Sequence, residues 1–569
     1  MTDTSRSPVD VEKSAQSVDA AATDAAPSDC PVDDRDHDRH HDHDHAHHVR
    51  SARADGTPWS VRLLGVISGI VAAIVGLGVA EAVAAASESL KSPVLDVGDR
   101  VVDGVPNSVK TLAIDWFGTN DKIALLVGIA SILAVYAAVV GLVAVTRRWR
   151  YSIGAIALFG LVGAYASQTT RRSAPWYAVV PSLVGGAAAA VALLWLRRQL
   201  VRTDDTDATP VDAGDYDRRR FLVASSATAA GAVAIGVAGR RFGVRTNAAA
   251  DRSEVAFPSA SDPLAPAPDA VSAGIDGMSP FFTPNDDFYR IDTALTVPQV
   301  SVDGWQLGIT GMVGKELSLS YQDLLDREII ESDITLTCVS NEVGGGLLGT
   351  ARWTGVRLDD LLAEAGIESG ADQIVGRSVD GYTCGFPVSA LDGRDALVAI
   401  GMNDEPLPLE HGYPARLIVP GLYGYVSATK WLQEIELTTF DQFDQYWVER
   451  DWVENAPIKL QSRIDTPRGL ASLQPGTNMI GGVAWAQTRG IEAVEVQIDD
   501  GDWLETTLAD ELNDVTWRQW TYQWDAQPGR HSIRVRGIES GGAIQTDERA
   551  EPFPSGATGQ HQIIVIVAA

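Results

Sequence analysis

Residues 334–358 read ITLTCVSNEVGGGLLGTARWTGVRL, and this stretch decides how the chain is interpreted. Apolar and polar residues alternate as far as Cys338, which predicts a strand that ends at this cysteine. A glycine-rich turn follows, and glycine lets a backbone approach another group closely. Three interpretations of Cys338 stay open: a buried structural cysteine, a thiolate nucleophile paired with His411, or a thiolate metal ligand whose partners come from a cofactor.

The composition of the 569 residues excludes several classes of protein. The formal net charge is −30 and the pI is about 4.6, which argues against nucleic acid as a partner, because phosphate binding requires clustered Lys and Arg. Such acidity is typical of a surface solvated in high salt and favours a halophile. Cys30, Cys338 and Cys384 are too few for a disulfide scaffold, although Cys338 and Cys384 could form a pair.

The first 240 residues divide into a polar tail and a membrane region. Residues 1–58 contain a His- and Asp-rich tract without apolar periodicity, which predicts a disordered tail that could bind metal loosely. Residues 59–240 hold apolar stretches near the ~20 residues that a bilayer crossing requires. We expect about five transmembrane helices, at 63–86, 122–145, 151–167, 176–196 and 221–239.

Basic residues beside these stretches predict the orientation. If the chain starts in the cytoplasm, these basic residues all fall on the cytoplasmic side of the membrane. They are Arg147, Arg148, Arg150, Arg197, Arg198, Arg202 and Arg218–Arg220. Arg171 and Arg172 are the exceptions. Everything after about residue 243 is then extracytoplasmic in a multi-pass cell-membrane protein. The sequence RRRFL (218–222) resembles a twin-arginine export signal, and an ordinary basic flank is the alternative.

The rest of the chain is expected to fold as two domains after a linker at 241–280. Residues 281–454 mix strands and helices without regular alternation, which indicates an α+β domain. In 455–569, Val494, Val496 and Ile498 alternate with polar residues before an Asp500–Gly501 turn signal, which favours an all-β immunoglobulin-like sandwich. The predicted fold class is thus multi-domain: all-α membrane helices, an α+β domain and an all-β sandwich.

Four segments together resemble the sulfite oxidase-like molybdopterin oxidoreductases. They are FFTPNDDFYRIDTAL (281–295), WQLGITGMV (305–313), the Cys338 stretch, and HGYPARLIVPGLYGYVSATKWLQEIEL (411–437). The all-β tail resembles the dimerisation domain of that family, so the resemblance covers about 280–569 and implies a homodimer.

The resemblance implies a molybdenum–molybdopterin cofactor. Cys338 would be the protein ligand of molybdenum and a catalytic residue, together with Tyr425. Arg416 would hold the phosphate, because its fork geometry matches that group. The implied cofactor-binding residues are Asn285, Phe288, Tyr289, Ser378, His411, Arg416, Gly424, Ser427 and Lys430.

The chain departs from the family pattern where sulfite would bind. Sulfite oxidases carry Arg before the Asn of the first motif and again after the cysteine, and here those places read Pro284 and Glu342–Val343. Glu would repel a dianion, which argues against sulfite unless Arg290, Arg352, Arg357 or Arg377 rebuilds the anion site.

We therefore predict a membrane-anchored oxidoreductase that transfers oxygen atoms to or from sulfite or a sulfoxide. No histidine occurs between His48 and His411, so the spans lack the paired ligands of a membrane haem. The electron partner is expected to be a separate cytochrome or quinone-linked protein. Two alternatives are a membrane-tethered binding protein with a degenerate fold and a metal sensor or transporter that uses the His tract.

Overall fold

The computed structural model describes residues 58–87, 90–105, 116, 121–169, 175–200, 218–242 and 248–569. The described residues all belong to the second of two units of the chain, Asp55–Ala569. The described residues do not include Cys30, the His-rich tract, Arg171, Arg172 and Arg202. The prediction of a disordered tail therefore also concerns residues outside the described part of the chain.

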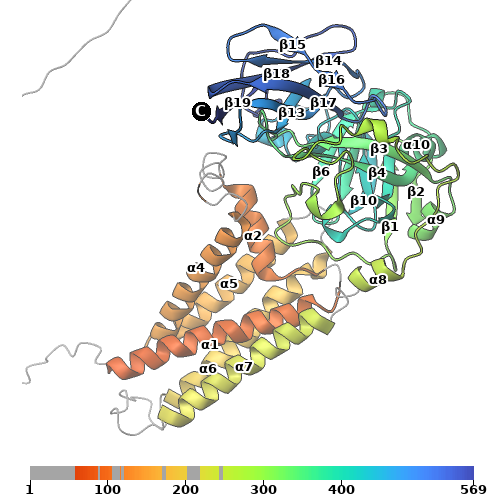
Figure 1. Ribbon diagram of the computed structural model, residues 1–569. Coiled ribbons are helices and arrows are strands. Elements are labelled where there is room, and N and C mark those ends of the chain that lie inside the picture. Colours follow the sequence, from red (N-terminus) through yellow and green to blue (C-terminus); the bar gives the residue numbers. More distant parts are fainter. Residues whose placement is uncertain are drawn as a thin grey trace, which may run out of the picture. The chain divides into compact units, whose positions relative to one another are not determined.

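The N-terminal part of the second unit is helical (Figure 1). Five of its described helices are long and apolar enough to cross a membrane, with mean hydropathies from 1.2 to 2.5, as the apolar stretches predict. α2 was not expected; its N-cap Ser92 accepts a hydrogen bond from Val94 N. The helices are α1 (Trp59–Ala84), α2 (Pro93–Gly104), α4 (Asp121–Ala144), α5 (Arg150–Thr169), 3₁₀ helix η2 (Trp176–Val179), α6 (Val180–Leu200) and α7 (Arg218–Phe242).

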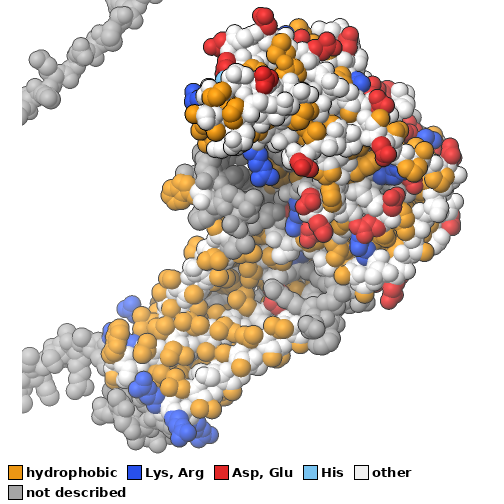
Figure 2. Space-filling model, viewed as in Figure 1, with side chains coloured by type: hydrophobic (Ala, Val, Ile, Leu, Met, Phe, Trp, Pro, Cys, Tyr) orange, Lys and Arg blue, Asp and Glu red, His pale blue; other side chains and the backbone are white. Residues whose placement is uncertain are grey.

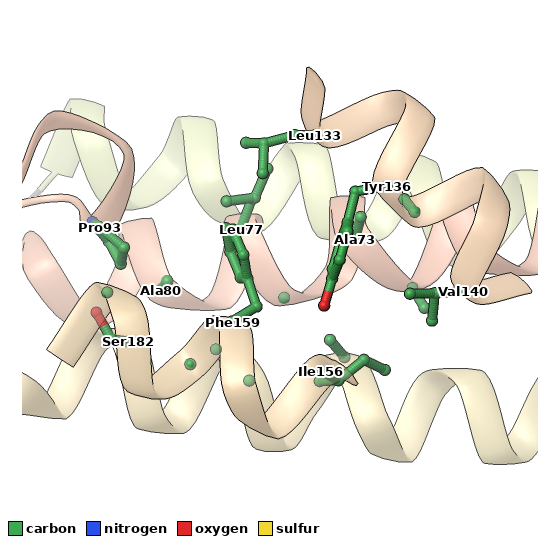
Figure 3. Close-up of a pocket in the computed structure, with 18 of the residues that line it drawn as sticks. Ala73, Leu77, Ala80, Pro93, Leu133, Tyr136, Val140, Ile156, Phe159 and Ser182 are labelled. Atoms are coloured by element: carbon green, nitrogen blue, oxygen red, sulfur yellow. The ribbon is translucent and has the colours of Figure 1, made fainter. Parts of the chain in front are cut away.

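Small residues let these helices pack closely. A Cβ on Gly69 would lie 2.0 Å from the Ala137 carbonyl oxygen, so α1 and α4 meet backbone to backbone. An apolar cavity of about 90 Å³ remains among α1, α2, α4, α5 and α6, with Tyr136 and Phe159 along its sides (Figure 3). The Tyr136 hydroxyl donates to the Ala155 carbonyl oxygen at 2.8 Å, and this polar group is thereby satisfied.

Basic side chains gather at one end of the helical region (Figure 2). Arg197 Nε donates to the Ala144 carbonyl oxygen at 3.0 Å, and its guanidinium lies 4.8 Å from the Trp149 ring centre. The C-terminal ends of α4 and α6 therefore lie together. Hydrophobic side chains cover much of the visible face of the helices, whereas acidic side chains are scattered over the β-rich part (Figure 2).

Residues 248–454 form a mixed region built on two sheets. One sheet has the order β2-β1-β10-β5-β6, and the other has the order β3-β4-β7-β8 with β9 paired to β7. Its strands are β1 (Gln306–Gly311), β2 (Leu317–Ser320), β3 (Ile330–Thr337), β4 (Leu348–Arg357), β5 (Gln373–Ser378), β6 (Thr383–Pro387), β7 (Leu397–Met402), β8 (Glu405–Pro406), β9 (Arg416–Ile418) and β10 (Leu432–Thr438). Its helices are α8 (Ala248–Glu254), η4 (Asp269–Val271), η5 (Asn285–Asp287), α9 (Tyr321–Leu325), α10 (Leu358–Ala365), η6 (Val388–Ala390), η7 (Leu409–His411), α11 (Gly424–Ser427) and η8 (Val448–Arg450).

Local sequence signals explain the short helices of this region. Ser320 and Asp323 form a capping box at the start of α9. Leu358, Leu361 and Leu362 are buried on one face of α10, and Gly366 ends it with a φ of +73° that glycine adopts without strain. The stretches SYQDLLD (320–326) and VRLDDLLAEAGI (356–367) predict both helices from the sequence.

Residues 461–567 form two further sheets around one apolar core. The orders are β11-β13-β17-β16 and β12-β19-β18-β14-β15. Val494 and Val496 are fully buried between them, as the alternation predicts, and Ile498 packs partly buried against the same core. The strands are β11 (Gln461–Thr466), β12 (Ser472–Leu473), β13 (Gly476–Trp485), β14 (Ile491–Ile498), β15 (Trp503–Glu505), β16 (Thr507–Leu508), β17 (Arg518–Ala526), β18 (Gly529–Glu539) and β19 (His561–Val567).

Two expectations need qualification. The segment 248–280, expected to be a linker without structure, contains α8 and buries Ala260 and Val271, because it packs on the mixed region; Ser261 N donates to the Ile329 carbonyl oxygen at 2.9 Å. Cys338 and Cys384 are both free thiols, so the disulfide left open by the sequence does not form.

Candidate functional site

Cys338 lies directly after β3, as the alternation predicts. It is 9% exposed, and its N–H donates to the Leu347 carbonyl oxygen at 2.9 Å across the base of the glycine-rich loop. Asn341 closes the same loop: its Oδ1 accepts from Leu347 N at 2.8 Å. Burial raises the pKa of the Cys338 thiol, so the neutral thiol is favoured until a cation stabilises the thiolate.

Arg416 begins β9 and is 5% exposed. One NH group donates to the His411 carbonyl oxygen at 3.0 Å, and the guanidinium lies 4.9 Å from the Trp353 ring centre. Its Nε has no hydrogen-bond partner, and no described acidic side chain forms an ion pair with it. Burial lowers the pKa of Arg416 to about 10, so a cation sits here without a protein counter-charge.

His411 and Asn285 connect Arg416 to the first motif. His411 Nε2 lies 3.1 Å from the Asn285 carbonyl oxygen, and the imidazole is 3% exposed. Burial, then the charge of Arg416, lowers the pKa of His411 to about 4, so this ring is neutral near pH 7. Asn285 Oδ1 accepts from Asn403 Nδ2 at 2.9 Å, which fixes the side-chain amide.

Tyr289 connects the cationic part to Cys338. Burial raises the pKa of Tyr289; the nearby Cys338 adds to the rise and Arg416 opposes it, so the phenol lies near both. A Cβ on Gly424 would lie 3.8 Å from the Tyr289 hydroxyl and 3.8 Å from the Thr337 carbonyl oxygen. Phe288 packs edge-on against Trp353 and His411, with ring centres 5.8 and 5.6 Å away.

Lys430 adds a second buried cation. It is 9% exposed, and its Nζ lies 3.0 Å from Asp292 Oδ2. Burial lowers the pKa of Lys430 to about 8, although Asp292 opposes this effect, while Arg416 and Arg290 add to it. The predicted residues from the 285–292 and 411–430 stretches thus come together around a positively charged, mostly buried site.

Three predicted residues use their hydroxyl groups for other contacts. Ser427 Oγ donates to the carbonyl oxygens of Leu422 and Tyr423, both at 3.1 Å. The Tyr425 hydroxyl donates to the Val453 carbonyl oxygen at 2.5 Å. Ser378 Oγ accepts from Asp380 N at 3.4 Å inside a tight turn. In this structure these hydroxyls stabilise backbone segments around the site.

Sequence reasoning missed several residues near Cys338. The charge of Cys338 contributes to the raised pKa values of Tyr382 and Tyr423, so both phenols lie near it. The Tyr382 hydroxyl donates to the Tyr425 carbonyl oxygen at 2.7 Å, and this contact connects β6 to α11. No spacing in the sequence relates Tyr382 to Cys338, because the two strands belong to different sheets.

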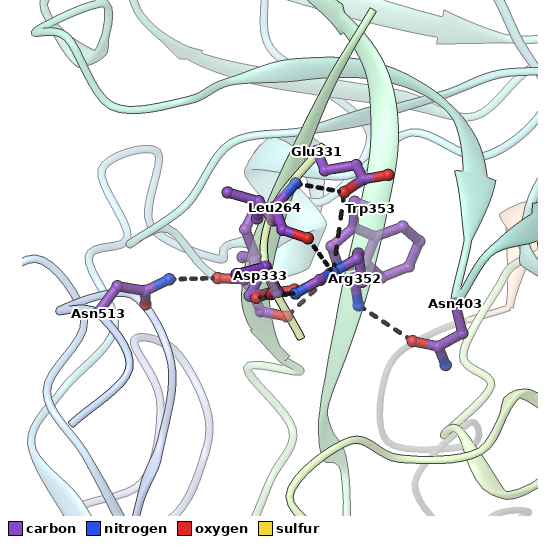
Figure 4. A network of polar contacts seen from close by, with 9 residues as sticks. Leu264, Glu331, Asp333, Arg352, Trp353, Asn403 and Asn513 are labelled. Carbon is purple, nitrogen blue, oxygen red and sulfur yellow. Dashed lines mark hydrogen bonds and ion pairs between the residues drawn. The ribbon is translucent and has the colours of Figure 1, made fainter. Parts of the chain in front are cut away.

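The four arginines proposed to rebuild an anion site are all held by carboxylates. Arg352 donates from Nε and from an NH group to Asp333, each at 2.9 Å, and reaches the carbonyl oxygens of Leu264 and Ala265 (Figure 4). The remaining pairs are Arg290 with Asp292, Arg357 with Asp395, and Arg377 with Glu434 and Glu436. Glu342 is exposed on the loop after Cys338.

Comparison with known proteins agrees with this geometry. Residues 294–447 match the model of the oxidoreductase molybdopterin binding domain. The mitochondrial sulfite oxidase of Macaca fascicularis is 29% identical over 317 residues, which cover 47% of this chain and 58% of that protein.

Two further similarities extend the comparison. An uncharacterized oxidoreductase of Bacillus subtilis (strain 168), YuiH, is 34% identical over 134 residues, covering 24% of this chain and 65% of that protein. The solved sulfane dehydrogenase SoxCD from Paracoccus pantotrophus shares 21% identity with a TM-score of 0.45, covering 50% of this chain and 80% of that chain. The chain thus spans little more than half the length of the sulfite oxidase it matches.

The matched domain and the curated relatives are those of oxidoreductases, and the description of the domain implies a molybdopterin cofactor. The residues present fit that group: a buried guanidinium with an unpartnered Nε matches an anionic phosphate. No cluster of three or more His, Cys, Asp or Glu suited to a metal ion occurs among the described residues.

Proposed function

We propose that the chain is a membrane-anchored, extracytoplasmic oxidoreductase that transfers an oxygen atom to or from a small substrate at a Cys338-bound molybdenum. The observation that carries the proposal is Arg416, a nearly buried cation without a carboxylate partner; the Tyr289 phenol lies within electrostatic range of both Arg416 and the Cys338 thiol. A buried unpaired charge is costly, so an anionic ligand at this place would stabilise the protein.

When bound, the molybdenum–molybdopterin group supplies two-electron oxygen-atom transfer. Cys338 would hold the metal, because a soft thiolate suits such a centre. Arg416 and Lys430 would hold the anionic end of the pterin, and neutral His411 would orient Asn285 through its contact at 3.1 Å. The aromatic rings of Phe288 and Tyr289, 5.4 Å apart, would exclude water from one side.

The substrate is proposed to be sulfite or a sulfoxide. The relatives named sulfite oxidases support the first. The ion pairs of Arg290, Arg352, Arg357 and Arg377 favour the second, because a neutral sulfoxide requires no free guanidinium. A separate cytochrome or quinone-linked protein would exchange electrons with the enzyme.

Membrane anchoring is supported by the five apolar helices and by the basic end that α4 and α6 share. Basic residues favour the cytoplasmic side, which would place residues after about 243 outside. We further propose that RRRFL, which begins α7, acts in export of the folded domain. The two-sheet region at 461–567 is proposed to be immunoglobulin-like and to dimerise the enzyme.

One measurement tests the central claim. The full chain, purified in detergent from a host that makes molybdopterin, is expected to contain about one molybdenum and one fluorescent pterin per chain. The same preparation would then be assayed with sulfite and an artificial electron acceptor, and with sulfoxides and an artificial donor. A folded protein without molybdenum would contradict the proposal, whatever the assays show.

A further inference from the structure

The glycine-rich loop after Cys338 is held from outside its own region. Within the loop, Cys338 N, Leu347 N and Asn341 N find partners inside residues 338–347. The carbonyl oxygen of Gly345 instead accepts a hydrogen bond from an NH group of Arg463 at 2.9 Å. Arg463 lies on β11, in the C-terminal two-sheet region, more than a hundred residues along the chain.

Arg463 is itself fixed on three sides. It is 8% exposed, its Nε donates to Asp465 Oδ1 at 2.6 Å, and its other NH group donates to Ser279 Oγ at 2.8 Å. A guanidinium held by a carboxylate and a hydroxyl has one orientation, so its bond to Gly345 acts as a rigid clamp.

His561 fills the space beside the same loop. A Cβ on Gly344 would lie 2.4 Å from the imidazole, and Gly344 has a φ of +81°. His561 Nδ1 accepts from Ile464 N at 3.0 Å, so the ring is anchored by the residue that follows Arg463. The glycine at 344 therefore lets the backbone approach His561, a group that the sequence alone left unnamed.

The C-terminal region also covers the strand that leads to Cys338. β3 is an edge strand, and its outer edge meets residues 487 and 513–517. Thr335 N donates to the Val515 carbonyl oxygen at 3.1 Å, and Asn513 Nδ2 donates to the Asp333 carbonyl oxygen at 2.9 Å (Figure 4). The strand before Cys338 and the loop after it are both held by this region.

We propose that Arg463 and His561 are positioning residues that hold the Gly344–Gly345 backbone and so fix Cys338 for its ligand role. The proposal rests on the proposed function for what Cys338 binds, but the clamp acts on the polypeptide alone. A ligand side chain requires such support, because a loosely held ligand loses affinity and geometry.

The chain offers matched variants for a test. Arg463→Ala removes the clamp, Arg463→Lys keeps the charge without the fork, and Gly344→Ala introduces a methyl group against His561. Gly346→Ala is the control for the glycine, because nothing lies within 4 Å of the added Cβ. Arg468→Ala is the control for the arginine, because Arg468 is exposed.

Amide hydrogen exchange of residues 338–347 is measured by peptide mass spectrometry on the full chain in detergent, prepared with and without the cofactor. We expect Arg463→Ala and Gly344→Ala to speed exchange of this loop by roughly tenfold or more, since a lost charge-assisted hydrogen bond favours local opening. The exchange rate in Arg463→Lys should lie between those of the original chain and Arg463→Ala. In both control variants the exchange rate should stay within about twofold of that in the original chain.

A second readout follows the thiol itself. In cofactor-free chain, alkylation of Cys338 should accelerate with loop exchange, while Cys384, which is fully buried, serves as the internal reference. His561→Ala, which removes the ring that packs against Gly344, should also speed exchange of the loop. In loaded enzyme the Mo(V) electron paramagnetic resonance spectrum should change in the clamp variants and not in the controls.

The outcomes separate the two proposals. If Arg463→Ala and Gly344→Ala show the same loop exchange rate and the same Cys338 reactivity as the original chain, the positioning role is wrong. Faster exchange in those variants, together with no molybdenum in the original chain, would reject the proposed function and keep the clamp. Should Arg463→Ala not fold, Gly344→Ala and Arg463→Lys decide the question alone.

Discussion

The surroundings of the two described cysteines differ, although both thiols are buried. Cys384 lies within β6 and is fully enclosed; its sulfur accepts a hydrogen bond from Thr429 Oγ1 at 2.9 Å. Cys338 lies at the end of an edge strand, in a loop clamped by another region and near the buried cation Arg416 through Tyr289. Burial alone thus does not distinguish the two thiols; position at a strand end near an uncompensated charge does.

The largest difference is expected from the cysteines themselves. Cys338→Ser should lower the molybdenum content and the turnover by more than about 100-fold, because it removes the thiolate proposed to hold the metal. Cys384→Ser should retain both. Molybdenum analysis and steady-state rates on the two variants measure the contrast, and equal losses in both would show that the two thiols do not differ in role.

Replacing Arg416 should have opposite effects on the stability of the cofactor-free protein and on its binding of the pterin. Arg416→Met removes a buried, unpaired guanidinium. The free energy of unfolding of the cofactor-free protein should therefore stay the same or rise by up to about 2 kcal/mol. The same variant should lose most of its pterin, because the phosphate partner is gone. Denaturant unfolding and pterin fluorescence report the two effects; a destabilised variant that keeps its pterin would contradict the role.

The pH dependence of stability follows from His411, whose folded pKa of about 4 lies below its ordinary value of 6.5. The unfolded chain binds the proton more readily, so stability is full above pH 6.5 and falls as the pH drops toward 4. The loss is on the order of 1–3 kcal/mol. His411→Gln should flatten this part of the curve in the cofactor-free chain, whereas a curve of unchanged slope would argue against the burial of a neutral ring.

His531 provides the control with the opposite sign. The hydrogen bond to Asp499 raises the pKa of His531 in the folded state. The stability that His531 contributes is therefore present below pH 6.5 and is lost as the pH rises through the folded pKa. His531→Gln should therefore leave the steep fall of stability below pH 6.5 unchanged, whereas His411→Gln should reduce it.

Cys384 should affect stability without affecting chemistry. Cys384→Ala leaves a small cavity and deprives the Thr429 hydroxyl of the sulfur acceptor, for a loss of about 1–2 kcal/mol. Thermal unfolding measures the change, and the rate of the surviving enzyme should equal that of the original. A changed rate would bring Cys384 into the site.

The smallest effect is expected at Arg357, whose pair with Asp395 is about two-fifths exposed on both sides. Arg357→Gln should change stability by less than about 1 kcal/mol, because exposed ion pairs contribute little. It should also leave the KM for sulfite unaltered. A marked rise in that KM would show that Arg357 binds an anion after all.

The sequence by itself determined the local elements and the candidate residues. Strand alternation predicts β3, β14 and β18, helical periodicity predicts α10, and the apolar stretches predict five membrane-length helices. These features depend on neighbours in the chain, so a single sequence contains them. The motif resemblance also singled out Cys338, His411, Arg416 and Lys430, which the structure brings into one region.

Only the tertiary structure decided what the surrounding groups do. The glycine-rich loop approaches His561, the four arginines are taken by carboxylates, and the hydroxyls of Tyr425 and Ser427 bind backbone oxygens. Most of these contacts join residues far apart in the chain; the pair of Arg290 with Asp292 and the bonds of Ser427 to Leu422 and Tyr423 are local. Charge and hydrogen-bond partners across such distances follow from packing, and no periodicity or spacing in the sequence records them.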